Sequence, residues 1–95
     1  MAPRLGCLYQ IYILRILAEH SPRYVETIYR KLCNEKRLNP NPENCRRAVR
    51  AALSKLIREG LVYRKREKGT WRWVYGLTRE GHKAAADLFI ERPAL

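Results

Sequence analysis

The sequence has no apolar run long enough to cross a membrane. The longest candidate, IYILRILA at residues 11–18, is interrupted by Arg15, whereas a membrane helix needs about 20 apolar residues. The amino-terminal stretch MAPRLGCLYQ also lacks the charged-then-apolar order and the cleavage site of an export signal. These absences predict a soluble, cytoplasmic protein with no membrane partner.

Groups suited to acid–base catalysis are equally scarce. The chain has one aspartate, Asp87, and its two histidines, His20 and His82, lie far apart in sequence. General acid–base chemistry needs positioned titratable groups, and no acidic pair is present. No GxGxxG, phosphate loop, HExxH or nucleophile elbow occurs either. We therefore expect neither an enzyme nor a cofactor-binding protein.

Cysteine is limited to Cys7, Cys33 and Cys45, with no CxxC spacing. Even with both histidines they make no local four-ligand zinc pattern, so we expect no metal. An odd number of cysteines without an export signal indicates reduced thiols. Cys33 and Cys45 fall on apolar helix faces, which favours small core side chains over the alternative of a redox switch at Cys45.

Positive charge, in contrast, is abundant. Twenty Lys+Arg against nine Asp+Glu give a net charge of +11. Residues 41–72 hold ten of the basic residues and three of the acids, so +7 of that charge lies in one third of the chain. Such clustering favours a nucleic-acid partner, and a location at the nucleoid, over a merely solubilising surface.

Hydrophobic periodicity predicts one domain over residues 1–95, α+β and mostly helical. Residues 8–20 are apolar on nearly all sides and residues 25–36 carry an i, i+3, i+4, i+7 stripe, so both segments predict helices. The intervening RYV could form a brief edge strand. A third helix is expected over 42–59, with Asn41 as N-cap, Pro42 at its first position and Gly60 just past its end.

The third helix is amphipathic, yet its polar side carries charge of nearly one sign. Its outward face is predicted to consist of Arg47, Ala51, Ser54 and Arg58, with Arg50 on the shoulder. These charges could instead pair along the helix, Glu43 with Arg47 and Lys55 with Glu59. Such pairs contribute only about 0.2–0.5 kcal/mol each, which is too little to account for so many arginines.

After Gly60 the pattern changes to that of an antiparallel hairpin. LVYRKR and WRWVYGL flank the short turn EKGT, which predicts a two-stranded wing over 61–77. Thr78 can cap a last helix over 79–92. Trp73 is predicted to pack in the core, whereas Trp71, nearer the turn, suits either packing or stacking on an unpaired base.

This order of elements is that of a winged helix-turn-helix, with a three-helix core, a two-stranded wing and a C-terminal helix. The motifs L-x-x-x-G-L-V at 56–62 and Y-x-L-T-x-x-G at 75–81, with the basic hairpin between them, resemble small MarR-, PadR- and ArsR-like regulators. Residues 13–32 are similar to the first two helices of that family, so the match covers roughly residues 8–90. The connection KRLNPNPEN is longer than the family's usual tight turn.

The resemblance implies a transcription regulator that binds double-stranded DNA in a sequence-specific manner. Helix 42–59 would enter the major groove, and wing 61–77 would lie on the backbone or in the minor groove. A guanidinium group can donate two hydrogen bonds to guanine or contact phosphate. We expect base contacts from Arg47 and Arg50, phosphate contacts from Arg46 and Arg58, and either from Ser54. The wing residues expected to bind DNA are Arg64, Lys65, Arg66, Lys68 and Arg72.

Helix 8–20 carries apolar side chains on nearly all sides, and one small core cannot cover them all. This predicts a homodimer formed through the first and last helices. Two alternatives stay open. The protein could bind nucleic acid without reading sequence, as a chromatin-like or single-strand binder. It could also be a winged-helix interaction module within a larger assembly, with its basic face on an acidic partner.

Overall fold

Four α-helices, one π-helical segment and three short strands make up the computed structural model, which describes residues 8–90. The elements are α1 (Leu8–Glu19), β1 (Arg23–Tyr24), α2 (Val25–Tyr29), η1 (Arg30–Glu35), α3 (Pro42–Arg58), β2 (Val62–Arg66), β3 (Trp73–Leu77) and α4 (Arg79–Ile90). This mostly helical α+β winged-helix architecture confirms the predicted fold class. Residues 91 and 92, which were expected to extend the last helix, lie outside the described residues.

The helix predicted over 25–36 is continuous but changes its hydrogen bonding along its length. α2 is followed directly by η1, a π-helical segment that closes with the amide of Lys36 donating to the carbonyl of Lys31. The apolar stripe could not reveal this change. Over so few residues, the α and π spacings place apolar side chains on nearly the same face.

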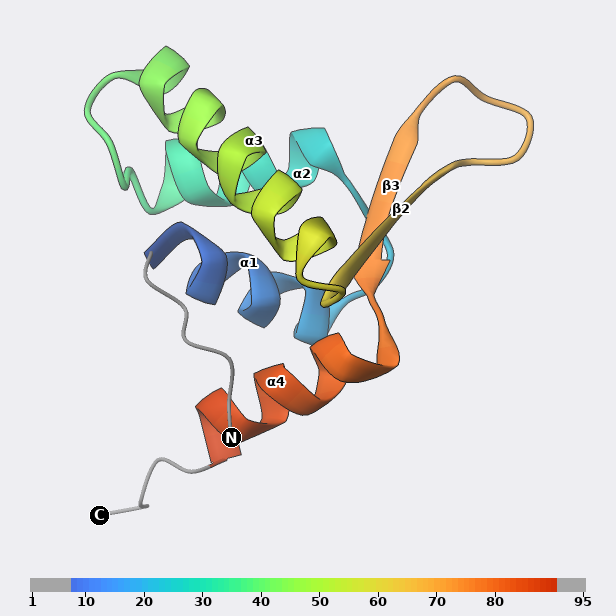
Figure 1. Cartoon of the computed structure of the whole chain (residues 1–95). Helices are drawn as coiled ribbons and strands as arrows, with labels where there is room; N and C mark the ends of the chain where they lie inside the picture. Colours follow the sequence, from blue (N-terminus) through green and yellow to red (C-terminus); the bar gives the residue numbers. More distant parts are fainter. Residues whose placement is uncertain (1–7, 91–95) are drawn as a thin grey trace.

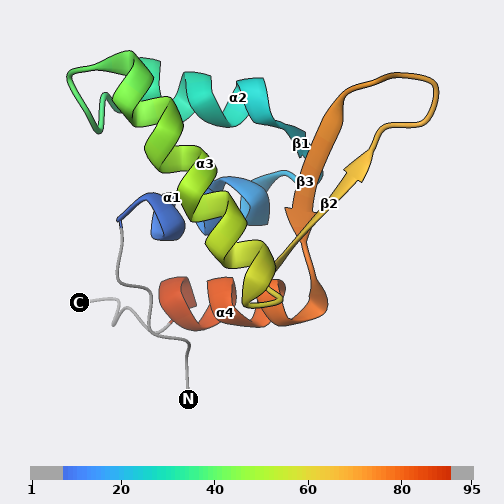
Figure 2. The same ribbon diagram turned by 45° about the horizontal axis from the view of Figure 1, so that its top comes forward.

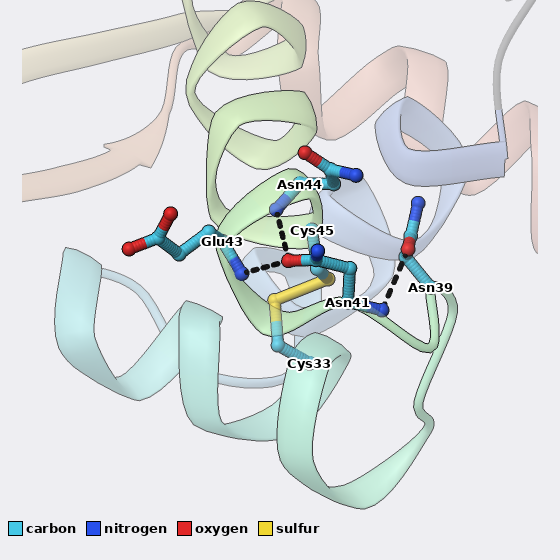
Figure 3. Close-up of a disulfide and its surroundings, with 6 residues drawn as sticks. All are labelled: Cys33, Asn39, Asn41, Glu43, Asn44 and Cys45. Atoms are coloured by element: carbon cyan, nitrogen blue, oxygen red, sulfur yellow. Dashed lines mark hydrogen bonds between the residues drawn. A yellow bond between two sulfur atoms is a disulfide. The ribbon is translucent and has the colours of Figure 1, made fainter.

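α3 begins at Pro42, as the sequence predicts, and ends at Arg58, one residue before the predicted end. The side-chain oxygen of Asn41 accepts hydrogen bonds from the amides of Glu43 (2.9 Å) and Asn44 (3.2 Å), and Pro42 occupies the first turn (Figure 3). Gly60 ends the helix with φ +78°, a left-handed conformation in which an L side chain would be strained. Both ends of the basic helix are therefore set by local chemistry.

The core is formed where α3 crosses α1, and it extends to the base of the sheet and to α4. Its largest fully buried apolar side chains are Ile13, Leu14, Leu17, Ile28, Leu32, Val49, Leu53, Leu56 and Val62. Each such burial stabilises the fold by about 1.5–3 kcal/mol. Since α1 contacts both α3 and α4, it is the layer that separates the basic helix from the C-terminal helix (Figures 1 and 2).

The sheet has three strands in the order β1-β3-β2, all antiparallel, rather than the two strands of the predicted wing. The suggested edge strand is present: Arg23 pairs with Tyr75 and Tyr24 with Val74. β3 is therefore the central strand at Val74 and Tyr75, and it also contacts α1, α2 and α4. This cover on both faces explains why Val74 and Tyr75 are both buried, although they point to opposite sides of the strand.

α4 is joined to the end of α3 through Thr78. Its hydroxyl donates to the carbonyl of Gly60 (2.6 Å) and accepts from the amide of Gly81 (3.0 Å), and its own amide donates to the carbonyl of Leu61 (3.1 Å). A side chain at Gly81 would overlap that carbonyl of Leu61. The glycine in the first turn of α4 is therefore required by this close approach.

The cysteines correct the prediction of reduced thiols. Cys33 in η1 and Cys45 in the first turn of α3 form a disulfide, with their Cα atoms 5.7 Å apart (Figure 3). Both residues are buried, as their apolar positions predicted. The prediction was wrong because the sequence placed each cysteine on the apolar face of its own helix, but did not show that the two faces are in contact. Cys7 lies outside the described residues.

No helix among residues 8–90 combines the length and the apolar character that spanning a bilayer requires.

The disulfide closes the long connection between η1 and α3, so its removal is expected to destabilise the fold. For cysteines 12 positions apart, the loss of loop-closure entropy predicts a decrease of about 3 kcal/mol in the free energy of unfolding. Replacing Cys33 and Cys45 together by alanine should produce this decrease in chemical denaturation. The wild type under reducing conditions should show a similar decrease, and unchanged stability in both samples would contradict the prediction.

Candidate nucleic-acid interface

The outward face of α3 is basic along its whole length. Its solvent-exposed side chains after the first turn are Arg46, Arg47, Arg50, Ala51, Ser54, Lys55 and Arg58. The opposite face, which carries Val49, Leu53 and Leu56, is buried. All five α3 residues predicted to contact DNA are thus exposed, and they come from one continuous helix.

Tyr29, at the end of α2, contacts two of these arginines. Its hydroxyl accepts a hydrogen bond from Nε of Arg50 (3.2 Å), and its ring lies 5.6 Å from the guanidinium carbon of Arg46. The sequence predicted Tyr29 only as part of an apolar stripe, so this contact was missed. It depends on how α2 packs against α3, which the spacing of residues along either helix does not reveal.

The charges of α3 are not neutralised along the helix. Within residues 8–90, neither Glu43 and Arg47 nor Lys55 and Glu59 form an ion pair. Arg46, Arg47 and Arg50 instead line an open depression together with Glu43. The alternative of a self-paired, solvated helix face therefore has no support in the observed contacts.

The hairpin of β2 and β3 provides a second exposed basic surface. It projects away from the helical body on the side of α1 opposite to α4 (Figures 1 and 2). The five predicted wing residues, Arg64, Lys65, Arg66, Lys68 and Arg72, are all exposed. The register sets Arg66 opposite Trp73 and Arg64 opposite Tyr75, so these four side chains share one face of the hairpin.

The tryptophans lie on the surface. Trp73 is 36% exposed, which makes the prediction of a core position wrong, and Trp71 is 83% exposed. The guanidinium carbon of Arg64 lies 4.3 Å from the ring centre of Trp73. That of Arg66 lies 5.0 Å from Trp71 and 5.1 Å from Trp73. The hairpin extends beyond the helices here, so the indoles pack on arginines of their own wing.

The other face of the wing is fastened to the first strand. Arg72 stacks on Tyr24 at 5.1 Å, and the hydroxyl of Tyr24 donates a hydrogen bond to the carboxylate of Glu67. This hydrogen bond is the main cause of a raised pKa for Tyr24, with desolvation and the charge of Glu67 acting in the same direction. The phenol therefore remains a neutral donor at neutral pH, and the wing is connected to β1 through it.

The arrangement as a whole suits a large polyanion. Two exposed basic elements lie on the same side of the molecule, and among residues 8–90 no three His, Cys, Asp or Glu side chains are grouped to hold a metal ion. Arginine edges on a helix and on a hairpin can donate to phosphate and to base edges.

Comparison with known proteins gives no match among family models or curated proteins. Solved structures do match. RosR from H. salinarum is 30% identical and has a TM-score of 0.68, with 88% of this chain and 71% of RosR covered. A structure of a RosR complex is also 30% identical over 85% of this chain, with a TM-score of 0.67.

ZitR from Lactococcus lactis has the same fold, with 22% identity and a TM-score of 0.69 over 90% of this chain. The chain spans about half the length of ZitR, 51%. Because the likeness to RosR combines 30% identity with coverage of 88% of this chain and 71% of RosR, the protein belongs to the winged helix-turn-helix superfamily of transcription regulators.

Proposed function

We propose that this protein regulates transcription by reading a specific sequence in double-stranded DNA, with α3 in the major groove. The observation that carries the proposal is the row of exposed, unneutralised arginines on α3, in a chain of this family. The major groove is about 12 Å wide, which admits a helix, and phosphates line both of its rims.

The residues of α3 suit different parts of the groove. Arg47 and Arg50 suit base contacts, because a guanidinium can donate two hydrogen bonds to O6 and N7 of guanine. Nε of Arg50 is already bonded to Tyr29, which holds the side chain and leaves its two terminal nitrogens to donate. Arg46 and Arg58 suit phosphates, and Ser54 suits either. Ala51 keeps the face low enough for close approach.

The wing suits the DNA backbone or the adjacent minor groove. Its five basic side chains are Arg64, Lys65, Arg66, Lys68 and Arg72, and arginine is attracted by the more negative potential of a narrow, A·T-rich minor groove. A few charged side chains are enough to keep an exposed edge strand from pairing with another chain. Five basic residues on the wing exceed that requirement.

A homodimer formed through α1 and α4 completes the proposal. Leu8 is 63% exposed, and Ile11, one turn further along α1, is partly exposed and is not among the side chains that pack against the core of the described residues. A second copy could cover this apolar strip. Two-fold symmetry would then match a pseudo-palindrome with half-sites about one helical turn apart.

Selection from random duplexes tests whether the protein reads sequence. The wild type should prefer its selected site over unrelated duplex by about 10³-fold or more at fixed salt. The double variant Arg47→Ala, Arg50→Ala should lose most of that preference, while Lys36→Ala, Arg37→Asn in the connection after η1 removes the same charge and should keep it. Equal affinity for all duplexes would favour the non-specific binder. DNA affinity that survives Arg47→Ala, Arg50→Ala would favour the protein-interaction module.

Salt dependence tests the contribution of the wing separately. Each phosphate contact that is lost should reduce the slope of log K against log salt by about 0.9. Lys65→Ala, Lys68→Ala should therefore lower the slope by nearly two, with little change in sequence preference. The Lys36→Ala, Arg37→Asn variant should leave the slope unaltered. A wing variant with the wild-type slope would show that these lysines do not contact phosphate.

Sedimentation tests the dimer. Ile11→Glu places a charge in the exposed strip of α1 and should convert a wild-type dimer to a monomer at micromolar concentration. Glu26→Lys on α2, also exposed but outside the strip, should remain dimeric. A wild type that is monomeric at high micromolar concentration, with no pairing on DNA, would refute this part of the proposal.

A further inference from the structure

One face of the wing carries alternating cationic and aromatic groups. Their order is Arg64, Trp73, Arg66 and Trp71, with neighbouring guanidinium carbons and ring centres 4.3, 5.1 and 5.0 Å apart. We call these four residues the wing ladder. Arg64 and Arg66 come from β2 and Trp73 from β3, where the register sets Arg66 opposite Trp73, and Trp71 precedes β3 in the turn.

The wing ladder leaves its guanidinium edges available. Arginine stacks through its flat face and donates hydrogen bonds from its edge, so an indole on one side does not prevent a phosphate contact. Neither Arg64 nor Arg66 forms an ion pair with any residue of 8–90. The ladder therefore combines unneutralised charge with aromatic surface, which is the combination used to hold single-stranded nucleic acid.

Trp71 forms the outer end of the ladder. Arg66 is the only group within the described chain that stacks on its ring, and 83% of the side chain remains exposed. The opposite face of the wing is occupied by the contacts of Tyr24 with Arg72 and Glu67, so the ladder face is the one left open.

We propose that Trp71 is a stacking site for an unpaired nucleobase, with the adjoining phosphates on the edges of Arg66 and Arg64. The ligand is a single-stranded segment. In a duplex, neighbouring base pairs stack and cover one another's faces, whereas an unpaired base can turn its face to an indole. The site goes beyond reading of duplex by α3 and does not depend on it. Together the two surfaces fit a duplex that continues into an unpaired stretch.

The test compares three labelled ligands by fluorescence anisotropy at one salt concentration. They are a duplex, the same duplex with a short thymidine extension, and the same duplex with an extension of abasic units. The two extensions carry equal phosphate charge and differ only in having bases. The wild type should bind the thymidine extension about 10-fold more tightly than the abasic one, because one stacked base contributes roughly 5- to 150-fold in affinity.

Substitutions of Trp71 test whether its indole causes the preference for the thymidine extension. Trp71→Ala should remove the preference for thymidine and leave affinity for the abasic extension unchanged, and Trp71→Phe should restore part of it. Quenching of indole emission by the thymidine extension should be lost in both variants. Trp71 is exposed, so unchanged thermal unfolding is expected and confirms that the variants fold.

Equal affinity of the wild type for thymidine and abasic extensions would overturn the proposal. A Trp71→Ala variant that loses affinity equally for all three ligands would also overturn it, since the indole would then contact the duplex or maintain the shape of the wing. Free thymidine and abasic oligonucleotides of one length repeat the comparison without duplex. A preference there supports the stacking site even if no duplex sequence is selected, so its failure is distinguishable from failure of the proposed function.

Discussion

The packing of α3 on α1 is the contact on which the rest of the structure depends. A helix that buries Val49, Leu53 and Leu56 in the core that it shares with α1 has only one face left for solvent. On α3 that face is the arginine face. The hydrophobic effect therefore fixes the direction of the charges, and the charges themselves contribute little to the fold. This division of labour lets a chain of 95 residues keep an unneutralised cationic surface, because the apolar face supplies the stability.

Three tertiary contacts refine this arrangement. The disulfide between Cys33 and Cys45 holds the start of α3 against η1 across an unusually long connection. Tyr29 supports the arginines of the first half of α3. At the other end, Thr78 joins the end of α3 to the base of the wing and to α4. The basic helix is thus held at both ends, and its side chains, rather than its backbone, are left to adapt to a ligand.

The two basic elements differ in how their arginines are supported. On α3 the guanidinium groups extend from a buried helix, and a single tyrosine contacts two of them. On the wing, Arg64 and Arg66 stack on indoles of the same hairpin, and Arg72 stacks on Tyr24 of β1. An isolated hairpin is only marginally stable in water. The pairing of β3 with β1, and the hydrogen bond from Tyr24 to Glu67, therefore matter for the stiffness of the wing as much as its own ladder does.

The scarcity of acid–base groups predicted that the chain is not an enzyme, and membership in a family of regulators agrees.

The sequence by itself determined where the helical segments and the hairpin lie and in which order, because periodicity, Asn41, Pro42 and Gly60 act over a few neighbouring residues. It also determined which face of α3 carries charge, since burial follows the same period. Only the tertiary structure decided the pairing of the cysteines, the third strand, the contact of Tyr29 with two arginines, and the exposure of Trp73. Each of these depends on the distance between segments that are far apart in sequence or on how far the hairpin extends past the helices. Local patterns carry no information about such distances, and the packing of α1, α2 and α3 sets them.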